Sequence, residues 1–256
     1  MFLPVIGESI IKRAAENGII QINITNIRDF SKDKHKKADD YPYGGGPGMI
    51  MTAQPIYDAY LSITKELSYK PYTIYMSPQG SVLNQSKVKE LGNLKHIIIL
   101  SGHYEGVDER VIKTIVDEEI SIGDYVLTGG ELPAMVLIDA VSRIIPGVLG
   151  NENGYKDETH FDGLIEYPQY TRPICFLGEK VPNILTSGHH ANITKWKRQQ
   201  SLVRTYIKRP DMFKKLILSN EDKRLLEEGL KEYNNTTTYT KQDWWRYDLQ
   251  GKTIMV

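Results

Sequence analysis

The chain has 256 residues, of which 32 are basic and 32 acidic, so its formal net charge at pH 7 is zero. With 40% hydrophobic and 25% charged residues it has the composition of a folded globular chain, which excludes a chain that is disordered throughout. No run approaches the roughly 20 consecutive apolar residues of a membrane span. Cys175 is the only cysteine, which excludes an intrachain disulfide and a multi-cysteine metal site. Together these features predict a cytoplasmic protein.

The first part of the chain alternates short β-rich runs with helical patterns, which is typical of an α/β domain with a largely parallel sheet. The run 97–100, Ile-Ile-Ile-Leu, is continuously apolar, as expected of a strand buried on both faces. The predicted strands are 19–25, 72–77, 96–101 and 119–122, and the predicted helices are 8–17, 55–68, 107–116 and 132–145.

The second part becomes mainly helical and basic after a polar segment at 150–158 that predicts a linker. Residues 186–224 hold ten Lys or Arg and three acidic side chains, whereas 105–131 holds eight acidic and two basic ones. Such segregation is typical of a protein that binds a polyanion with one region and carries out its reaction in another. The alternative is two solvated surfaces that differ in charge without a functional reason. Helices are predicted at 191–208, 211–218 and 221–233, and the aromatic tail from 234 onward, with Trp244, Trp245 and Tyr247, is expected to dock.

Three glycine-bearing loops are predicted directly after strands, at 77–80, 102–106 and 122–130. Ligands of open α/β sheets bind beyond the carboxyl ends of the strands, and glycine lets backbone amides approach a ligand closely. The three loops together therefore predict one ligand crevice. The chain has no G-x-G-x-x-G after a strand and no G-x-x-x-x-G-K-[ST], so a dinucleotide or a nucleoside triphosphate is disfavoured.

Five segments together resemble the bacterial tRNA (guanine-N1)-methyltransferases, the TrmD family of the SPOUT superfamily. The resemblance covers the chain from Met1 to about Arg224, with the segments in order and at family spacing. These segments are Tyr-Gly-Gly-Gly-Pro-Gly-Met at 43–49, Ser-Pro-Gln-Gly at 77–80, Gly-His-Tyr-Glu-Gly-Val-Asp-Glu-Arg at 102–110, Ser-Ile-Gly-Asp-Tyr-Val-Leu-Thr-Gly-Gly-Glu-Leu at 121–132 and Tyr-Pro-Gln-Tyr-Thr-Arg-Pro at 167–173.

The resemblance implies a homodimer with a trefoil-knotted α/β domain at 1–149, a flexible linker at 150–172 and a small helical tRNA-binding domain at 173–256. It implies transfer of a methyl group from S-adenosylmethionine to N1 of guanosine 37 of tRNA, next to the anticodon, at the dimer interface. Family members usually begin with an apolar strand that would precede Met1. A wrongly assigned start or a truncation is the preferred explanation; a true absence would cost the sheet a partner strand and lower stability, and neither case affects the site residues. The cofactor residues carried over are Tyr75, Ser77, Pro78, Gly80, Gly102, Tyr104, Glu105, Ile122, Gly123, Asp124, Tyr125, Val126, Leu127, Gly129 and Gly130.

Methylation of guanine N1 needs a base for the N1 proton and a cation for the charge that develops on O6. Arg143 matches the family's catalytic arginine. The family's base is a linker aspartate, and a gap-free count from Arg143 places Glu158 there, with Asp157 and Asp162 as alternatives. The family's reported dependence on magnesium suggests an oxygen site, for which Glu105 is a candidate ligand, but no spacing defines one.

The predicted helix 191–208 mixes basic residues with Trp196 and Tyr206, a combination that suits phosphate contact with some base stacking. Its candidate RNA-binding residues are Lys195, Arg198 and Arg204. The alternative is an exposed, solubilising helix. For the whole chain, the alternatives are a knotted methyltransferase with a different RNA target and a non-catalytic RNA-binding protein.

Overall fold

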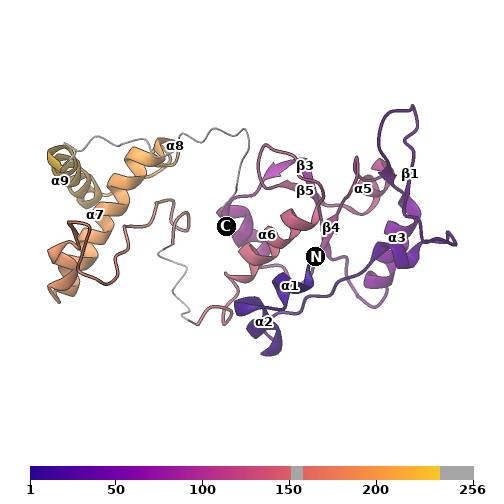
Figure 1. Ribbon diagram of the computed structural model, residues 1–256, viewed down its shortest axis with the longest axis horizontal. Helices are drawn as coiled ribbons and strands as arrows, with labels where there is room; N and C mark the ends of the chain where they lie inside the picture. Colours follow the sequence, from indigo (N-terminus) through magenta and orange to yellow (C-terminus); the bar gives the residue numbers. More distant parts are fainter. Residues whose placement is uncertain (151–157, 237–256) are drawn as a thin grey trace. The chain divides into compact units, whose positions relative to one another are not determined.

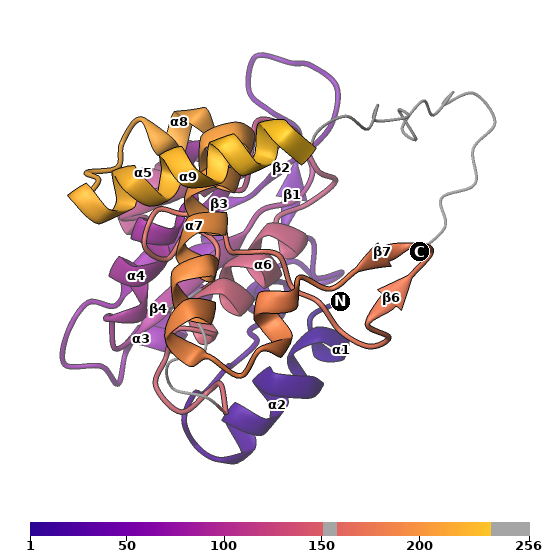
Figure 2. The ribbon, with the colours of Figure 1, turned by 90° about the vertical axis from the view of Figure 1, so that its left-hand side faces the viewer.

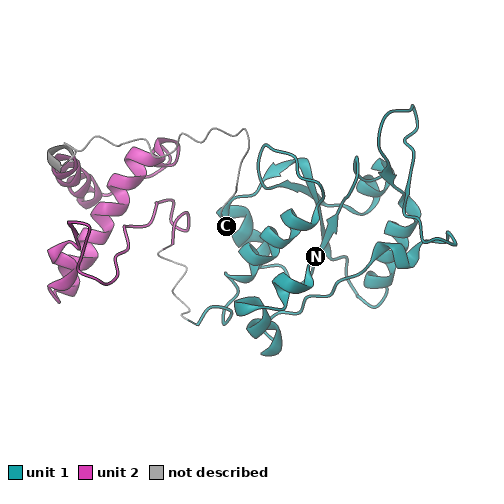
Figure 3. Cartoon of the chain, viewed as in Figure 1, with its two compact units in different colours: residues 1–155 teal, residues 156–256 magenta. Residues whose placement is uncertain are grey.

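The computed structural model describes residues 1–150 and 158–236, in two compact units, 1–155 and 156–256 (Figure 3). The predicted aromatic tail and the alternative base Asp157 lie outside the described residues. Within the described residues, no helix combines the length and the apolar character that crossing a membrane requires.

Unit 1 is an α/β domain around a parallel three-stranded sheet, as predicted (Figure 1). Its long central strand lies between the other two, in the order β4-β3-β5. A separate antiparallel pair brackets the glycine-rich segment 44–48. The strands are β1 (Asp39–Asp40), β2 (Ile50–Met51), β3 (Tyr72–Val82), β4 (Ile97–Ser101) and β5 (Glu118–Ser121).

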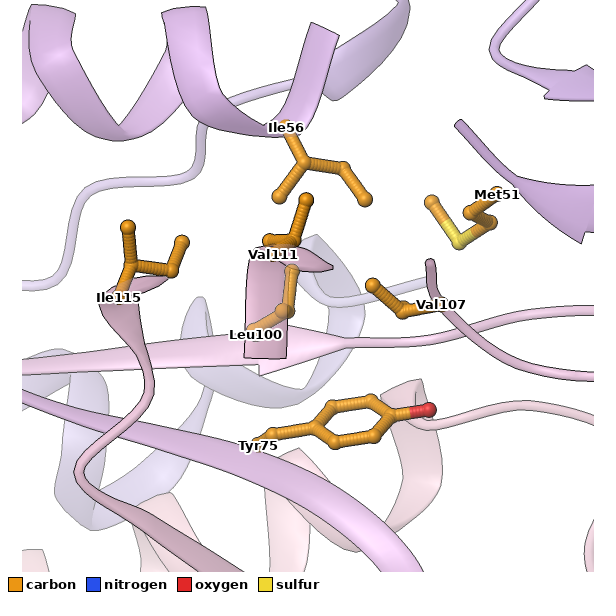
Figure 4. Close-up of a cluster of buried hydrophobic side chains, with 7 residues drawn as sticks. All are labelled: Met51, Ile56, Tyr75, Leu100, Val107, Val111 and Ile115. Atoms are coloured by element: carbon orange, nitrogen blue, oxygen red, sulfur yellow. The ribbon is translucent and has the colours of Figure 1, made fainter. Parts of the chain in front are cut away.

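The helices of unit 1 cover both faces of the sheet, because successive side chains of β3 point to opposite sides. Tyr75 joins a core cluster with residues of α3 and α5, shown in Figure 4, whereas Ile74 and Met76 join a second cluster with Leu91 of α4 and Leu137 of α6. The helices are α1 (Leu3–Ile6), α2 (Ser9–Glu16), the 3-10 helix η1 (Ile27–Phe30), α3 (Ala53–Thr64), α4 (Gln85–Gly92), α5 (Glu109–Ile115) and α6 (Glu131–Ser142).

The strand predicted at 19–25 does not form, so this prediction was wrong. Ile20, Ile22 and Ile24 alternate with polar residues in the period of a strand. A strand also needs a backbone partner, and within the described residues this segment pairs with none. It remains without regular structure, and Ile24 is exposed.

Unit 2 is mainly helical, with α9 lying against α7 (Figure 2). Leu164, from the predicted linker, packs with Leu202 of α7 and Leu225 of α9 in its core. The helix predicted at 211–218 is only one turn, and the hairpin of β6 and β7 was not predicted. The elements are β6 (Cys175–Phe176), β7 (Glu179–Lys180), η2 (Asn183–Thr186), α7 (His190–Lys208), α8 (Pro210–Phe213) and α9 (Asn220–Thr236).

Candidate active site

The sequence predicted that 77–80 is a loop after a strand. In the structure this segment is instead a bulge inside β3. Met76 and Ser81 both pair with Ile120 of β5, so the four residues between them leave the ladder and β3 then rejoins it. Such a register shift changes the direction of the chain locally without ending the strand. Because the segment returns to the same neighbour, its two ends are fixed by the sheet.

Gly80 is required where the bulge rejoins the sheet. A Cβ atom built on Gly80 would lie 2.5 Å from the backbone nitrogen of Ile120 and would also overlap the carbonyl group of Glu119. Backbone atoms of a central sheet cannot move aside as a flexible side chain can. Only a residue without a side chain therefore fits.

The variant Gly80→Ala is expected to destabilise unit 1 by about 1–3 kcal/mol, because the added methyl group overpacks the contact between β3 and β5. Thermal unfolding should show a melting temperature lower by at least several degrees. Gly150→Ala is the matched control, since a Cβ atom there would meet nothing within 4 Å. Equal melting temperatures for the two variants would contradict this account of the bulge.

The other two predicted loops meet each other at the same edge of the sheet. The backbone N–H of Gly130 donates to the carbonyl oxygen of Gly102 at 2.8 Å, and His103 and Gly129 form an antiparallel bridge. A Cβ atom on Gly130 would lie 2.8 Å from the nitrogen of Gly102, so the contact depends on glycine. The start of α6 is thereby held against the loop that follows β4.

The bulge and the two loops enclose one cavity of about 290 Å³. Thirteen of the fifteen residues predicted for the cofactor line it, and the other two, Gly80 and Asp124, do not. Sequence reasoning missed several lining residues that precede or follow the quoted motifs or lie within them: Met76, Gln79, His103, Gly106, Val107, Glu109, Ile112, Glu119, Ile120, Ser121, Thr128 and Pro133.

The formal charge of the cavity wall is negative. Glu105, Glu109 and Glu119 are among the described lining residues, which include no Lys or Arg. Burial, and then the nearby Glu119 carboxylate, raises the pKa of Tyr75, so its hydroxyl is a protonated hydrogen-bond donor at neutral pH. A ligand with a positive charge suits this wall better than a phosphate does.

Tyr104, in the loop after β4, is held in a left-handed conformation with a φ of 59°. Arg28 of η1 donates from its guanidinium to the Tyr104 hydroxyl at 3.0 Å and pairs with Asp39 at 3.6 Å. The N–H of the next residue, Glu105, donates to the carbonyl oxygen of Met49 at 3.0 Å. The loop after β4 is thus tied to η1 and to the residue that follows the glycine-rich segment. No pattern in the sequence had pointed to Arg28.

The two predicted catalytic residues do not line this cavity. Arg143 is the C-cap of α6, at the opposite end of the helix from Gly130. Twelve residues of α helix span about 18 Å. Glu158 is a half-buried residue of unit 2 whose carbonyl oxygen accepts from the N–H of Phe161 at 3.2 Å. The alternative base Asp162 pairs with Arg198 at 3.2 Å.

The described residues contain no group of three or more His, Cys, Asp or Glu side chains that could hold a metal ion. The carboxylates of the cavity wall therefore define no magnesium site. Glu105 instead packs its side chain against Gly48, where a Cβ atom would lie 2.5 Å from Glu105 Oε1.

The three predicted RNA-binding residues differ in how they are held. Lys195 is half-exposed, with Glu228 at 4.0 Å. Arg198 forms a two-pronged ion pair with Asp222, at 2.8 and 3.1 Å, which holds the pKa of that carboxyl below its usual value. Arg204 has a buried Nε without a hydrogen-bond partner among the described residues. Lys195, whose acidic partner is at 4.0 Å, therefore holds its charge less tightly than Arg198 does and is better placed to pair with a phosphate.

The model of the family described as tRNA (Guanine-1)-methyltransferase TrmD matches residues 1–215 of the chain. The chain belongs to this family. It is 64% identical to a tRNA (guanine-N(1)-)-methyltransferase of Ruminiclostridium cellulolyticum over 84% of its own length and 93% of the relative's. Proteins of the same name from Alkaliphilus oremlandii and Halalkalibacterium halodurans are 54% and 50% identical, over 89% and 91% of this chain and 94% of each relative. The resemblance to the TrmD family is thus confirmed, and the cavity is the candidate active site of a TrmD-family chain.

Proposed function

We propose that the protein transfers the methyl group of S-adenosylmethionine to N1 of guanosine 37 in tRNA. Family membership supports tRNA guanine-N1 methylation. The single structural observation that carries the proposal is that the three glycine-bearing segments, 77–80, 102–106 and 122–130, line one cavity. Its volume of about 290 Å³ is close to the lower bound of about 300 Å³ for small-molecule sites.

The cavity suits S-adenosylmethionine in its chemistry as well as its size. Backbone groups of the glycine-bearing segments on the cavity wall can read the edge of an adenine and a ribose, apart from the N–H of Gly130 and the carbonyl of Gly102, which bond to each other. The carboxylates Glu105 and Glu119 favour a cation in the cavity. When bound, the cofactor supplies an electrophilic methyl group on a positively charged sulfonium.

In this proposal, the chain's own residues prepare the guanine to receive the methyl group. The carboxylate of Glu158 accepts the N1 proton, and the guanidinium of Arg143 stabilises the negative charge that develops on O6. Asp162 is a weaker candidate for the base, because its carboxylate is already paired with Arg198. The N1 lone pair would then bond to the methyl carbon as the carbon–sulfur bond of the donor breaks, the sulfur would keep that electron pair and leave as S-adenosylhomocysteine, and the base would retain the proton.

The position of Arg143 supports a site shared between two copies of the chain. The backbone of Arg143 lies about 15 Å along α6 from Pro133, the last residue of the helix on the cavity wall of its own chain, which is too far for its side chain to reach a guanine bound there. Leu132 and Val136 of α6 are each 47% exposed, and Val126 of the cavity wall is 82% exposed. An exposed apolar face beside the cavity fits an isologous dimer in which each copy supplies Arg143 to the other.

The remaining parts of the proposal come from the family resemblance. They are a trefoil knot in unit 1, a linker at 150–172 whose residues 151–157 lie outside the described residues, tRNA contact by the helical domain from 173 onward, and a location in the cytoplasm. A single cysteine in 256 residues suits the reducing conditions of that compartment.

The decisive test is to incubate the protein with a tRNA transcript and S-adenosylmethionine that carries a labelled methyl group, and then to map the modified nucleoside. Label in 1-methylguanosine at position 37 is the expected result. Label in another base or in ribose would identify a knotted methyltransferase with a different target. Absence of both transfer and binding of S-adenosylhomocysteine by calorimetry would favour a non-catalytic RNA-binding protein.

Replacing Lys195 with alanine is expected to weaken tRNA binding and to lower the slope of log K against log salt by about 1, because one phosphate contact is lost. Filter binding over a range of salt concentrations measures both. Arg198→Lys is the informative comparison: it keeps the charge but loses the two-pronged pairing with Asp222, and should lower the melting temperature while leaving the salt slope unchanged. An unaltered slope for Lys195→Ala would place the tRNA contact elsewhere.

A further inference from the structure

The carboxylate of Glu118, at the start of β5, contacts three hydrogen-bond donors around the bulge of β3. Its Oε1 accepts a hydrogen bond from the Ser81 hydroxyl at 3.2 Å, and its Oε2 accepts from the Tyr72 hydroxyl at 3.0 Å. The ammonium group of Lys87 lies 3.2 Å from Oε2. The Glu118 side chain is only 19% exposed, so these bonds compete with little water.

The donors come from both sides of the bulge. Tyr72 lies before it on β3, Ser81 follows it directly, and Lys87 belongs to α4, which comes next in the chain. Burial, and then the bond to Glu118, raises the pKa of Tyr72, so this hydroxyl remains a donor at neutral pH. The carboxylate thus ties the outgoing and the returning parts of β3 to the same point of β5.

Glu118 does not line the cavity, whereas Ser77, Pro78 and Gln79 of the bulge do. The register of the sheet fixes where the bulge begins and ends. Beyond that register, Glu118 provides the only side-chain hydrogen bond to Ser81 among the described residues. The conformation of the cavity-lining bulge therefore depends on a group that stands outside the cavity.

We propose that Glu118 is a positioning residue for cofactor binding, which holds the 77–80 bulge in the conformation that meets the ligand. This inference rests on the proposed function, since it takes the cavity as the S-adenosylmethionine site. A bulge released from Glu118 samples other conformations, and the apparent affinity falls in proportion to the fraction of competent protein. Glu118 acts through the bulge and does not touch the cofactor.

The test measures binding of S-adenosylhomocysteine to the full-length protein by calorimetry, for the wild type and for Glu118→Ala. Loss of two hydrogen bonds and an ion pair at the bulge should weaken binding about tenfold. In steady-state assays KM for S-adenosylmethionine should rise by a similar factor, with kcat within about twofold of wild type. A purely stabilising role would lower the melting temperature and leave the dissociation constant unchanged, and that result would overturn the proposal.

Three further variants make the test specific. Ser81→Ala removes one of the bonds at an exposed site and should weaken binding about threefold, with a less than additive effect in the double variant with Glu118→Ala. Glu118→Gln retains an acceptor for the hydroxyls and should recover part of the affinity. Glu90→Gln removes the other carboxylate partner of Lys87, at 2.8 Å, without touching the bulge, and should bind like the wild type.

The outcomes separate this inference from the proposed function. If the wild type does not bind S-adenosylhomocysteine, the cofactor assignment itself fails. If the wild type binds and both Glu118→Ala and Ser81→Ala bind equally well, only the role of Glu118 is refuted. Should Glu118→Ala fail to fold, Ser81→Ala decides alone, because its side chain is exposed and its loss leaves the core intact.

Discussion

Replacing Glu158 with glutamine is expected to slow methyl transfer by about 10²–10⁴-fold, because glutamine cannot accept the N1 proton and a positioned base contributes a factor of that size. Binding of S-adenosylhomocysteine should remain normal, since Glu158 does not line the cofactor cavity. Single-turnover kinetics with a tRNA transcript measure the chemical step, and calorimetry measures the binding.

The matched control for this variant is Asp162→Asn. Asp162 accepts from the N–H of Leu164 at 3.2 Å and pairs with Arg198, so its loss should lower stability and leave the chemical step nearly unchanged. The reverse result, a normal rate in Glu158→Gln and a slow one in Asp162→Asn, would make Asp162 the base. Normal rates in both would direct the assignment to Asp157.

Replacing Arg143 with alanine is expected to slow methyl transfer by about 10²–10³-fold, the usual cost of removing a donor that stabilises developing negative charge. Cofactor binding should again be retained, because the cavity of each chain is complete without Arg143. The same single-turnover assay checks the rate, and an unchanged rate would remove Arg143 from the reaction.

A mixed dimer tests whether Arg143 serves the other copy of the chain. Gly130→Ala is designed to disrupt the cavity by pushing apart the two loops of its wall, since its Cβ would lie 2.8 Å from the nitrogen of Gly102, and it leaves Arg143 in place. A mixed dimer of this variant with Arg143→Ala contains one site with both an open cavity and an intact arginine. Co-expression should therefore restore up to about one quarter of wild-type activity from two inactive proteins. No recovery in a proven mixed dimer would mean that Arg143 serves its own chain.

The three cofactor segments could be found from the sequence because their signal is local. Continuous apolar runs predict buried parallel strands, and the glycines that follow them mark where the backbone approaches a ligand. The structure brings these segments to one cavity, with thirteen of the fifteen expected residues on its wall. Their roles in binding stay a prediction.

The form of the first segment could not be read in the same way. Ser77–Gly80 has the composition of a loop, with proline and glycine, yet β3 continues beyond it to Val82. Whether a strand ends or bulges depends on whether a neighbour receives it again, and here Ile120 of β5 pairs with both Met76 and Ser81.

The α/β order of unit 1, the helical character of unit 2 and the motifs of the TrmD family could all be predicted from the sequence, because periodicity, glycine placement and motif spacing are properties of neighbouring residues. The folded structure was needed to establish that 19–25 forms no strand, that Arg198 is held by Asp222, and that Glu118 ties the bulge to β5. Each of these depends on which distant group meets the residue, since a strand needs a backbone partner and a charge needs a counter-charge. A single sequence does not contain that information in any local pattern.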